Sequence, residues 1–115
     1  MRKLLRSFGY AFEGICQGIS TQRNMKIHVA VALLVIVLGA IVSLSWLEWT
    51  IIIIVICSVI SLELLNTAIE AAIDLHGSEW HPLAKLAKDT AAGAVLVMSI
   101  GAAIIGLIIF WPKLF

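Results

Sequence analysis

Charged side chains are scarce in this chain, where Lys, Arg, Asp and Glu together make up only 13% of the 115 residues. The net charge is +1 and the eight basic residues form no run, so the basic patch typical of nucleic-acid-binding proteins is missing. Hydrophobic residues make up 62%, which is more than a soluble domain of this length can bury. We therefore expect one membrane-embedded domain over residues 1–115, because no linker rich in Pro, Gly or Ser divides the chain.

Cysteine is also scarce. Cys16 and Cys57 lie far apart and form no CxxC motif, so we expect neither a zinc site nor a disulfide framework. The N-terminus begins like a signal peptide, but Arg6 interrupts its apolar run and Glu13 follows. Both charges argue against cleavage, and we expect the mature chain to begin at Met1.

Three long apolar segments predict membrane-spanning helices. They cover residues 28–47, 49–69 and 91–110, and each approaches the roughly 20 residues that a bilayer requires. All three should be helical, because lipid offers no partner for open backbone N–H and C=O groups.

The segment 2–22 predicts a different kind of helix, because apolar residues recur at helical spacing with charged residues among them. This pattern is typical of an amphipathic helix that lies on a membrane surface, although a helix folded against the bundle fits it equally well. The expected fold is all-α, with an N-terminal surface helix and three transmembrane helices. The apolar positions are Leu4, Leu5, Phe8, Phe12, Ile15 and Ile19.

Basic residues predict the orientation. Lys85 and Lys88 precede the third span, whereas the tight connection expected at residues 45–49 has no basic residue. The N-terminus and the loop before the third span should therefore face the cytoplasm. Five further basic residues precede the first span and agree with this orientation: Arg2, Lys3, Arg6, Arg23 and Lys26.

The most informative segment is the polar stripe of the second span. Glu63, Asn66, Glu70 and Asp74 are spaced i, i+3, i+7 and i+11, so a helix places them on one face. An ionisable group inside a span costs roughly 2.5 to 3.5 kcal/mol on insertion scales, which favours a functional site. The alternative is a polar seam that holds helices together.

Depth separates the members of this stripe. Counted from Trp49, Glu63 lies roughly 21 Å and Glu70 roughly 31 Å along the helix, against a hydrocarbon core of about 30 Å. Glu63 should therefore lie in the inner leaflet, while Glu70 and Asp74 reach water. This arrangement is typical of an enzyme that joins a membrane-bound substrate to a soluble one, and it fits a transmembrane conduit poorly.

Polar residues also precede the third span. Lys88 can contact a phosphate as a point charge, and Asp89 can fix a neighbouring donor or a metal. The alternative is an interfacial pair that extends to water. His28 and His81 have no His or Cys at ligand spacing, so a structural or interfacial role is expected for both.

These motifs resemble the prokaryotic diacylglycerol kinase family and, within it, the Gram-positive branch whose members phosphorylate undecaprenol. The resemblance implies a homotrimeric kinase of the bacterial cell membrane, with a surface helix, three spans per subunit and active sites shared between neighbours. It also implies nucleotide binding without a P-loop, and no GxxxxGK[ST] occurs here. The matching segments are residues 9–12, 24–28, 63–74, 81–89 and 91–95.

The resemblance also implies a reaction and its residues. The γ-phosphoryl group of ATP passes to undecaprenol, giving undecaprenyl phosphate, or alternatively to diacylglycerol, giving phosphatidic acid. Glu63 resembles the general base and Glu70 a ligand of Mg²⁺. Asn66 would position groups beside the phosphoryl group, Lys88 would neutralise its charge and Asp89 would orient these partners. Candidate nucleotide contacts are Arg6, Tyr10 and Glu79.

Gln22 departs from the family pattern, which usually has a second metal-binding Glu at this position. An amide keeps the size and the acceptor oxygen but loses the charge, which predicts weaker binding of Mg²⁺ and an engineered or natural low-activity enzyme, unless the metal is held differently. Two other classes remain open at this point: a small proton-coupled transporter, and a noncatalytic assembly or regulatory subunit.

Overall fold

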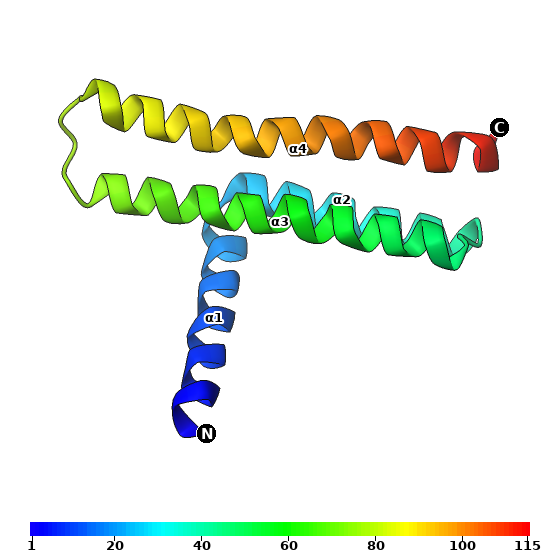
Figure 1. Ribbon diagram of the computed structural model, residues 1–115, viewed down its shortest axis with the longest axis horizontal. Helices are drawn as coiled ribbons and strands as arrows, with labels where there is room; N and C mark the ends of the chain where they lie inside the picture. Colours follow the sequence, from blue (N-terminus) through cyan, green and yellow to red (C-terminus); the bar gives the residue numbers. More distant parts are fainter.

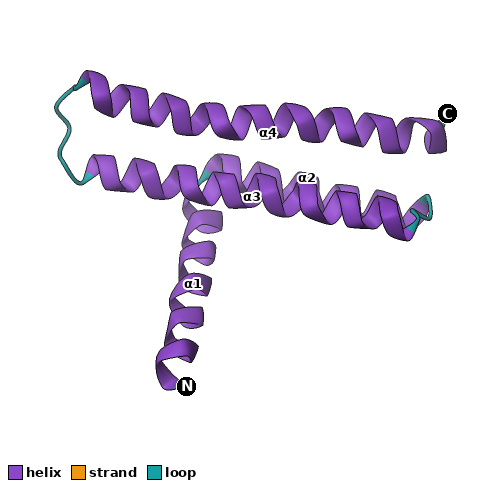
Figure 2. Ribbon diagram, viewed as in Figure 1, coloured by secondary structure: helices purple, strands orange, loops and turns teal.

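The computed structural model describes residues 1–115 as four helices and no strand. These are α1 (Arg2–Thr21), α2 (Arg23–Ile41), α3 (Trp46–Asp74) and α4 (Pro82–Leu114). Helix α3 packs against both α2 and α4, and α1 runs away from this bundle, across its direction (Figure 1). Only short loops join the helices (Figure 2). The prediction of an all-α fold is confirmed.

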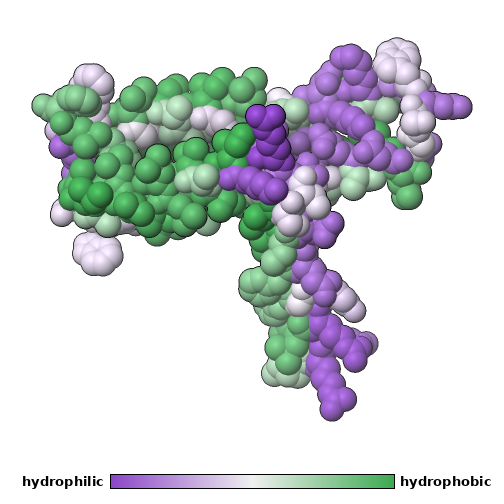
Figure 3. Space-filling model, turned by 180° about the vertical axis from the view of Figure 1, so that it is seen from behind, coloured by the Kyte–Doolittle hydropathy of each residue, from purple (hydrophilic) through white to green (hydrophobic).

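Helices α2, α3 and α4 are long and apolar enough to cross a membrane. Hydrophobic residues cover most of the bundle surface in Figure 3, while hydrophilic residues gather at one end of the bundle and along one side of α1. Only 13 of the 115 residues are buried, so most large apolar side chains of a single chain face outward. The three apolar segments predicted from the sequence therefore correspond to α2, α3 and α4.

The connection between α2 and α3 lies at residues 42–45, earlier than the predicted one at 45–49. The predicted first span to Leu47 was too long, because α2 ends at Ile41. The Ser45 hydroxyl accepts a hydrogen bond from the Glu48 N–H (3.2 Å), and the Glu48 carboxylate accepts one from the Ser45 N–H (2.9 Å). This capping box fixes the start of α3 at Trp46.

Helices α3 and α4 extend beyond the other predicted spans, α3 to Asp74 and α4 back to Pro82. Proline suits the first position of a helix, where its missing N–H has no intrahelical partner. The ring Nδ1 of His81 accepts a hydrogen bond from the Leu83 N–H (3.0 Å) and caps α4. These extensions carry the polar ends of α3 and α4 past the apolar part of the bundle.

The packed core lies at the end of the bundle that holds the α2–α3 connection. Its buried cluster consists of Leu44, Ile52, Ile109 and Phe110. Beside it, Lys113 Nζ lies 3.0 Å from Glu48 Oε1 and joins the end of α4 to the start of α3. The polar stripe of α3 points to the opposite end of the bundle.

Gly39 permits the close packing of α2 on this core. A Cβ at Gly39 would lie 2.8 Å from Leu44 Cδ1 and 2.8 Å from Trp49 Cη2, whereas one at Gly14 in α1 meets nothing within 4 Å. We expect Gly39→Ala to be less stable than Gly14→Ala by about 1–3 kcal/mol, the usual cost of overpacking. Unfolding of both variants in the same detergent, followed by circular dichroism, measures this difference. Equal stability would contradict the close contact.

Candidate active site

The polar stripe of α3 runs from a buried carboxylate to exposed ones. Glu63 and Asn66 are 2% and 7% exposed, Glu70 is half-buried, and Asp74 is exposed. The Asn66 amide nitrogen donates a hydrogen bond to Glu70 Oε1 (3.4 Å), and Asn66 Oδ1 is buried without a partner. The helical spacing therefore brings the predicted stripe together as expected.

His28 of α2 is the close neighbour of Glu63. Its Nε2 atom lies 3.4 Å from Glu63 Oε2, and the side chain of His28 is 21% exposed. The sequence predicts a structural or interfacial role for His28 and gives no connection between it and the stripe. The available signal was distance along the chain: His28 lies 13 residues before the end of α2 and Glu63 lies 17 residues after the start of α3. An antiparallel pair of helices therefore brings them within about one helical turn of each other.

At the exposed end of the stripe, Lys88 connects α4 to α3. Its Nζ donates a hydrogen bond to Asp74 Oδ1 (2.6 Å). This hydrogen bond holds the pKa of Lys88 above its ordinary value, because the charged form of the lysine gains the partner. Lys88 therefore stands at the same end of the bundle as Glu70, as the sequence predicted, and it is ionised there.

Asp89 lies beside Lys88 in sequence but has another partner. Lys85 Nζ donates a hydrogen bond to Asp89 Oδ2 (2.5 Å) along α4, and this bond raises the pKa of Lys85. Lys88 and Asp89 therefore do not bind each other, since each side chain pairs elsewhere. The alternative, in which both are interfacial groups that extend to water, stays a prediction. Nor does Asp89 hydrogen-bond to any residue of the α3 stripe in this conformation.

An open polar pocket of about 560 Å³ lies between the ends of α3 and α4 and the loop that joins them. Glu79 shares this pocket with Lys88 and Asp89. The polar side chains that line it include Asp74, Ser78, Glu79, His81, Lys85, Lys88 and Asp89.

Other candidate residues lie away from this pocket. Arg6 and Tyr10 are exposed on α1, which leaves the bundle, and neither lines the pocket of its own chain (Figure 1). Gln22 lies half-buried at the junction of α1 and α2. Near this junction α1 packs closely on α3, where a Cβ at Gly18 would lie 3.0 Å from Leu64 Cδ2.

Fold and site together define a small helical membrane protein with an acidic stripe that leads from inside its apolar bundle to an open polar pocket. The chain belongs to the prokaryotic diacylglycerol kinase family, whose model matches residues 9–110. The family resemblance seen in the motifs is confirmed.

Three relatives illustrate this membership. The chain is 49% identical to the undecaprenol kinase of Bacillus subtilis over 99% of this chain and 93% of that one. It is 43% identical to the diacylglycerol kinase of Synechocystis over 96% of this chain and 64% of that one. It is 29% identical to the diacylglycerol kinase of Escherichia coli K12 over 95% of this chain and 89% of that one. These relatives are kinases, so the chain is an ATP-dependent lipid kinase, and the transporter and noncatalytic alternatives are set aside.

Proposed function

We propose that this enzyme transfers the γ-phosphoryl group of ATP to undecaprenol and releases undecaprenyl phosphate. The similarity to the Bacillus subtilis undecaprenol kinase over nearly the whole chain supports this substrate. The main structural support for this reaction is the polar stripe of α3. It leads from a buried carboxylate at Glu63 to a polar pocket that is open to water. Diacylglycerol is the alternative acceptor, favoured by the name of the Synechocystis relative.

Glu63 provides the carboxylate that drives removal of the proton from the lipid hydroxyl. Its side chain is almost fully enclosed by the bundle, so the reaction of an apolar alcohol beside it excludes bulk water. Its position inside an apolar helix also matches an alcohol whose chain is dissolved in the membrane. Direct attack on the γ-phosphorus then needs this alcohol and the nucleotide to meet between Glu63 and Glu70.

Lys88 provides positive charge for the transferred phosphoryl group. Phosphoryl transfer depends mainly on positioning and on charge stabilisation, so a fixed ammonium group near the γ-phosphate is effective. In this conformation Lys88 is bound to Asp74, and a phosphate would compete with that carboxylate for the same Nζ. Asn66 positions the groups beside the phosphoryl oxygen, and Asp89 and Glu79 line the nucleotide side of the pocket.

Mg²⁺ would be held by Glu70, with Asn66 and Gln22 near the same end of the bundle. No group of three His, Cys, Asp or Glu side chains gathers closely enough to hold a metal alone. This donor set still fits Mg²⁺, which usually takes one or two carboxylates together with substrate phosphates. The unpartnered Asn66 Oδ1 beside Glu70 is a further oxygen donor. When bound, the ion neutralises charge on the phosphates.

The assembly proposed is a homotrimer with its active sites facing the cytoplasm. Arg6 and Tyr10 lie too far along α1 to line the pocket of their own chain, so they would reach a neighbour's nucleotide. Helix α1 would lie on the membrane surface, because hydrophobic residues occupy one side of it (Figure 3). The basic residues near the N-terminus favour the cytoplasmic side.

The test is transfer of labelled phosphate from ATP to undecaprenol and, separately, to diacylglycerol, with purified protein and Mg²⁺ in mixed micelles. Faster phosphorylation of undecaprenol supports the proposed substrate. Product from diacylglycerol alone would reassign the substrate within the family. If neither lipid is phosphorylated, the proposed function is wrong.

Gln22→Glu tests whether the missing carboxylate limits the enzyme. We expect severalfold lower half-saturating Mg²⁺ and a faster rate, because a charged oxygen ligand binds this ion better than an amide. Gln17→Glu adds the same charge on exposed α1 and should change neither value. A Gln22→Glu enzyme with unchanged rate and Mg²⁺ dependence would show that the metal is held by other groups.

A further inference from the structure

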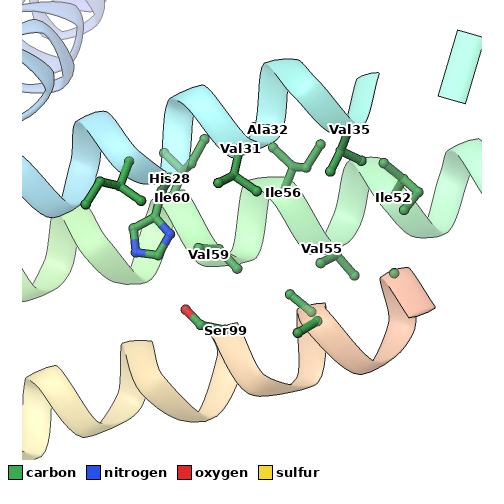
Figure 4. Close-up of a pocket in the computed structure, with 14 residues that line it drawn as sticks. His28, Val31, Ala32, Val35, Ile52, Val55, Ile56, Val59, Ile60 and Ser99 are labelled. Carbon is green, nitrogen blue, oxygen red and sulfur yellow. The ribbon is translucent and has the colours of Figure 1, made fainter. Parts of the chain in front are cut away.

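An apolar cavity of about 350 Å³ lies between α2, α3 and α4 (Figure 4). Its walls are almost entirely Val, Ile, Ala and Gly, which suits a hydrocarbon chain. Only two polar side chains reach it, His28 from α2 and Ser99 from α4. In Figure 4 the His28 ring points from α2 toward the side of the cavity where Ser99 lies.

Glu63 does not line this cavity, and at 2% exposure it has little access to anything inside it. The His28 ring does line the cavity, and its Nε2 lies 3.4 Å from Glu63 Oε2. The ring therefore contacts both the space and the carboxylate. A general base must come within hydrogen-bond reach of the proton that it removes, and in this conformation a hydroxyl in the cavity meets His28 first.

The two ring nitrogens then have different tasks. A proton on Nε2 is donated toward the Glu63 carboxylate, which leaves the Nδ1 lone pair free to accept a proton. A base oriented by a carboxylate on its far side is the usual arrangement for activating a hydroxyl. The carboxylate also stabilises the charge of the ring once both nitrogens carry protons.

We infer that His28 is the direct proton acceptor for the lipid alcohol and that Glu63 acts through it. The O–H bond of the alcohol breaks as the Nδ1–H bond forms, and the alcohol oxygen bonds to the γ-phosphorus while the bond to the ADP oxygen breaks. The ring later returns its proton to water. This inference rests on the proposed lipid kinase function and specifies how the proton leaves the substrate.

His28→Ala tests the inference in the phosphate-transfer assay. We expect kcat to fall about 100-fold or more, the usual contribution of acid–base catalysis, with KM for ATP unchanged. Added imidazole should restore activity severalfold, which a purely structural role does not explain. His76→Ala removes an exposed histidine outside both cavities and should leave the rate unchanged.

His28→Gln keeps a polar side chain in the cavity and serves if His28→Ala does not fold. It should fold like the wild type and remain as slow as expected for His28→Ala. The inference is wrong if a folded His28 variant keeps kcat within about twofold of the wild type, because loss of the acid–base contribution should cost far more.

The ring itself gives a second measurement, independent of turnover. Nitrogen NMR of labelled histidine in the wild type should show the His28 ring protonated on Nε2, and Glu63→Gln should abolish this preference. A ring protonated on Nδ1 in the neutral form would overturn the inference. If the wild type phosphorylates no lipid, the proposed function fails instead, and the ring measurement still reports whether His28 and Glu63 are paired.

Discussion

Glu63→Gln should lower kcat for lipid phosphorylation by about 10²–10⁴-fold and leave KM for ATP nearly unchanged. The amide keeps the shape of the side chain but cannot hold positive charge on His28 or take up a proton. Because Glu63 is buried, lies 3.4 Å from His28 and does not line the outer pocket, we expect its loss to act on the proton transfer and not on nucleotide contacts. Steady-state kinetics with undecaprenol in mixed micelles measure both constants.

Glu48→Gln is the matched control, since it makes the same change at the opposite end of α3. Glu48 binds the Ser45 N–H and Lys113, and these contacts hold the pKa of its carboxyl below the ordinary value. Its stabilising contribution is therefore present at neutral pH and is lost as pH falls through the lowered pKa. We expect Glu48→Gln to be less stable at neutral pH but fully active. If both variants lost activity equally, the proposed catalytic role of Glu63 would be wrong.

Lys88→Met should lower kcat by about 10²–10³-fold, the usual cost of removing one charge-stabilising group at a reacting centre. The ammonium group of Lys88 reaches across the pocket from α4 to Asp74 on α3, and the proposed function places the phosphate there, between the two helices. Methionine preserves most of the length of the side chain and removes the charge. Single-turnover transfer of labelled phosphate measures the chemical step directly.

Lys85→Met provides the comparison, because Lys85 is one helical turn away and pairs with Asp89 along its own helix. We expect a much smaller loss than for Lys88→Met. The interpretation would be wrong if the two variants lost activity to the same extent. Asp74→Asn tests whether the Lys88–Asp74 contact is itself needed for phosphoryl transfer. This variant should retain most activity, because the phosphate replaces Asp74 as the partner of Lys88.

The helices were predictable because each apolar run is long and continuous. The α2–α3 turn was misplaced because Leu44, Trp46 and Leu47 continue the apolar pattern through it. Hydropathy alone therefore cannot show where the backbone reverses. The useful signal was local, the Ser45 and Glu48 capping box that starts α3.

The site was predictable to the extent that it depends on a single helix. Helical periodicity placed Glu63 and Asn66 on one face without any knowledge of neighbouring helices. The contact between His28 and Glu63 depends on how α2 and α3 are aligned, which a single helix does not specify. For the same reason, the choice of Asp74 over Asp89 as the partner of Lys88 required the structure.

The length of α4 has a consequence for how the enzyme responds to its membrane. Its 33 residues make a helix of about 50 Å, well beyond a hydrocarbon core of about 30 Å. The turns that carry Lys88 and Asp89 therefore project beyond the acyl chains, while deeper parts of the stripe are immersed in them. A change in bilayer thickness shifts the boundary between acyl chains and water along the helices. Acyl-chain length should then tune turnover, with the fastest rate at the thickness that keeps Glu63 in lipid and Glu70 in water.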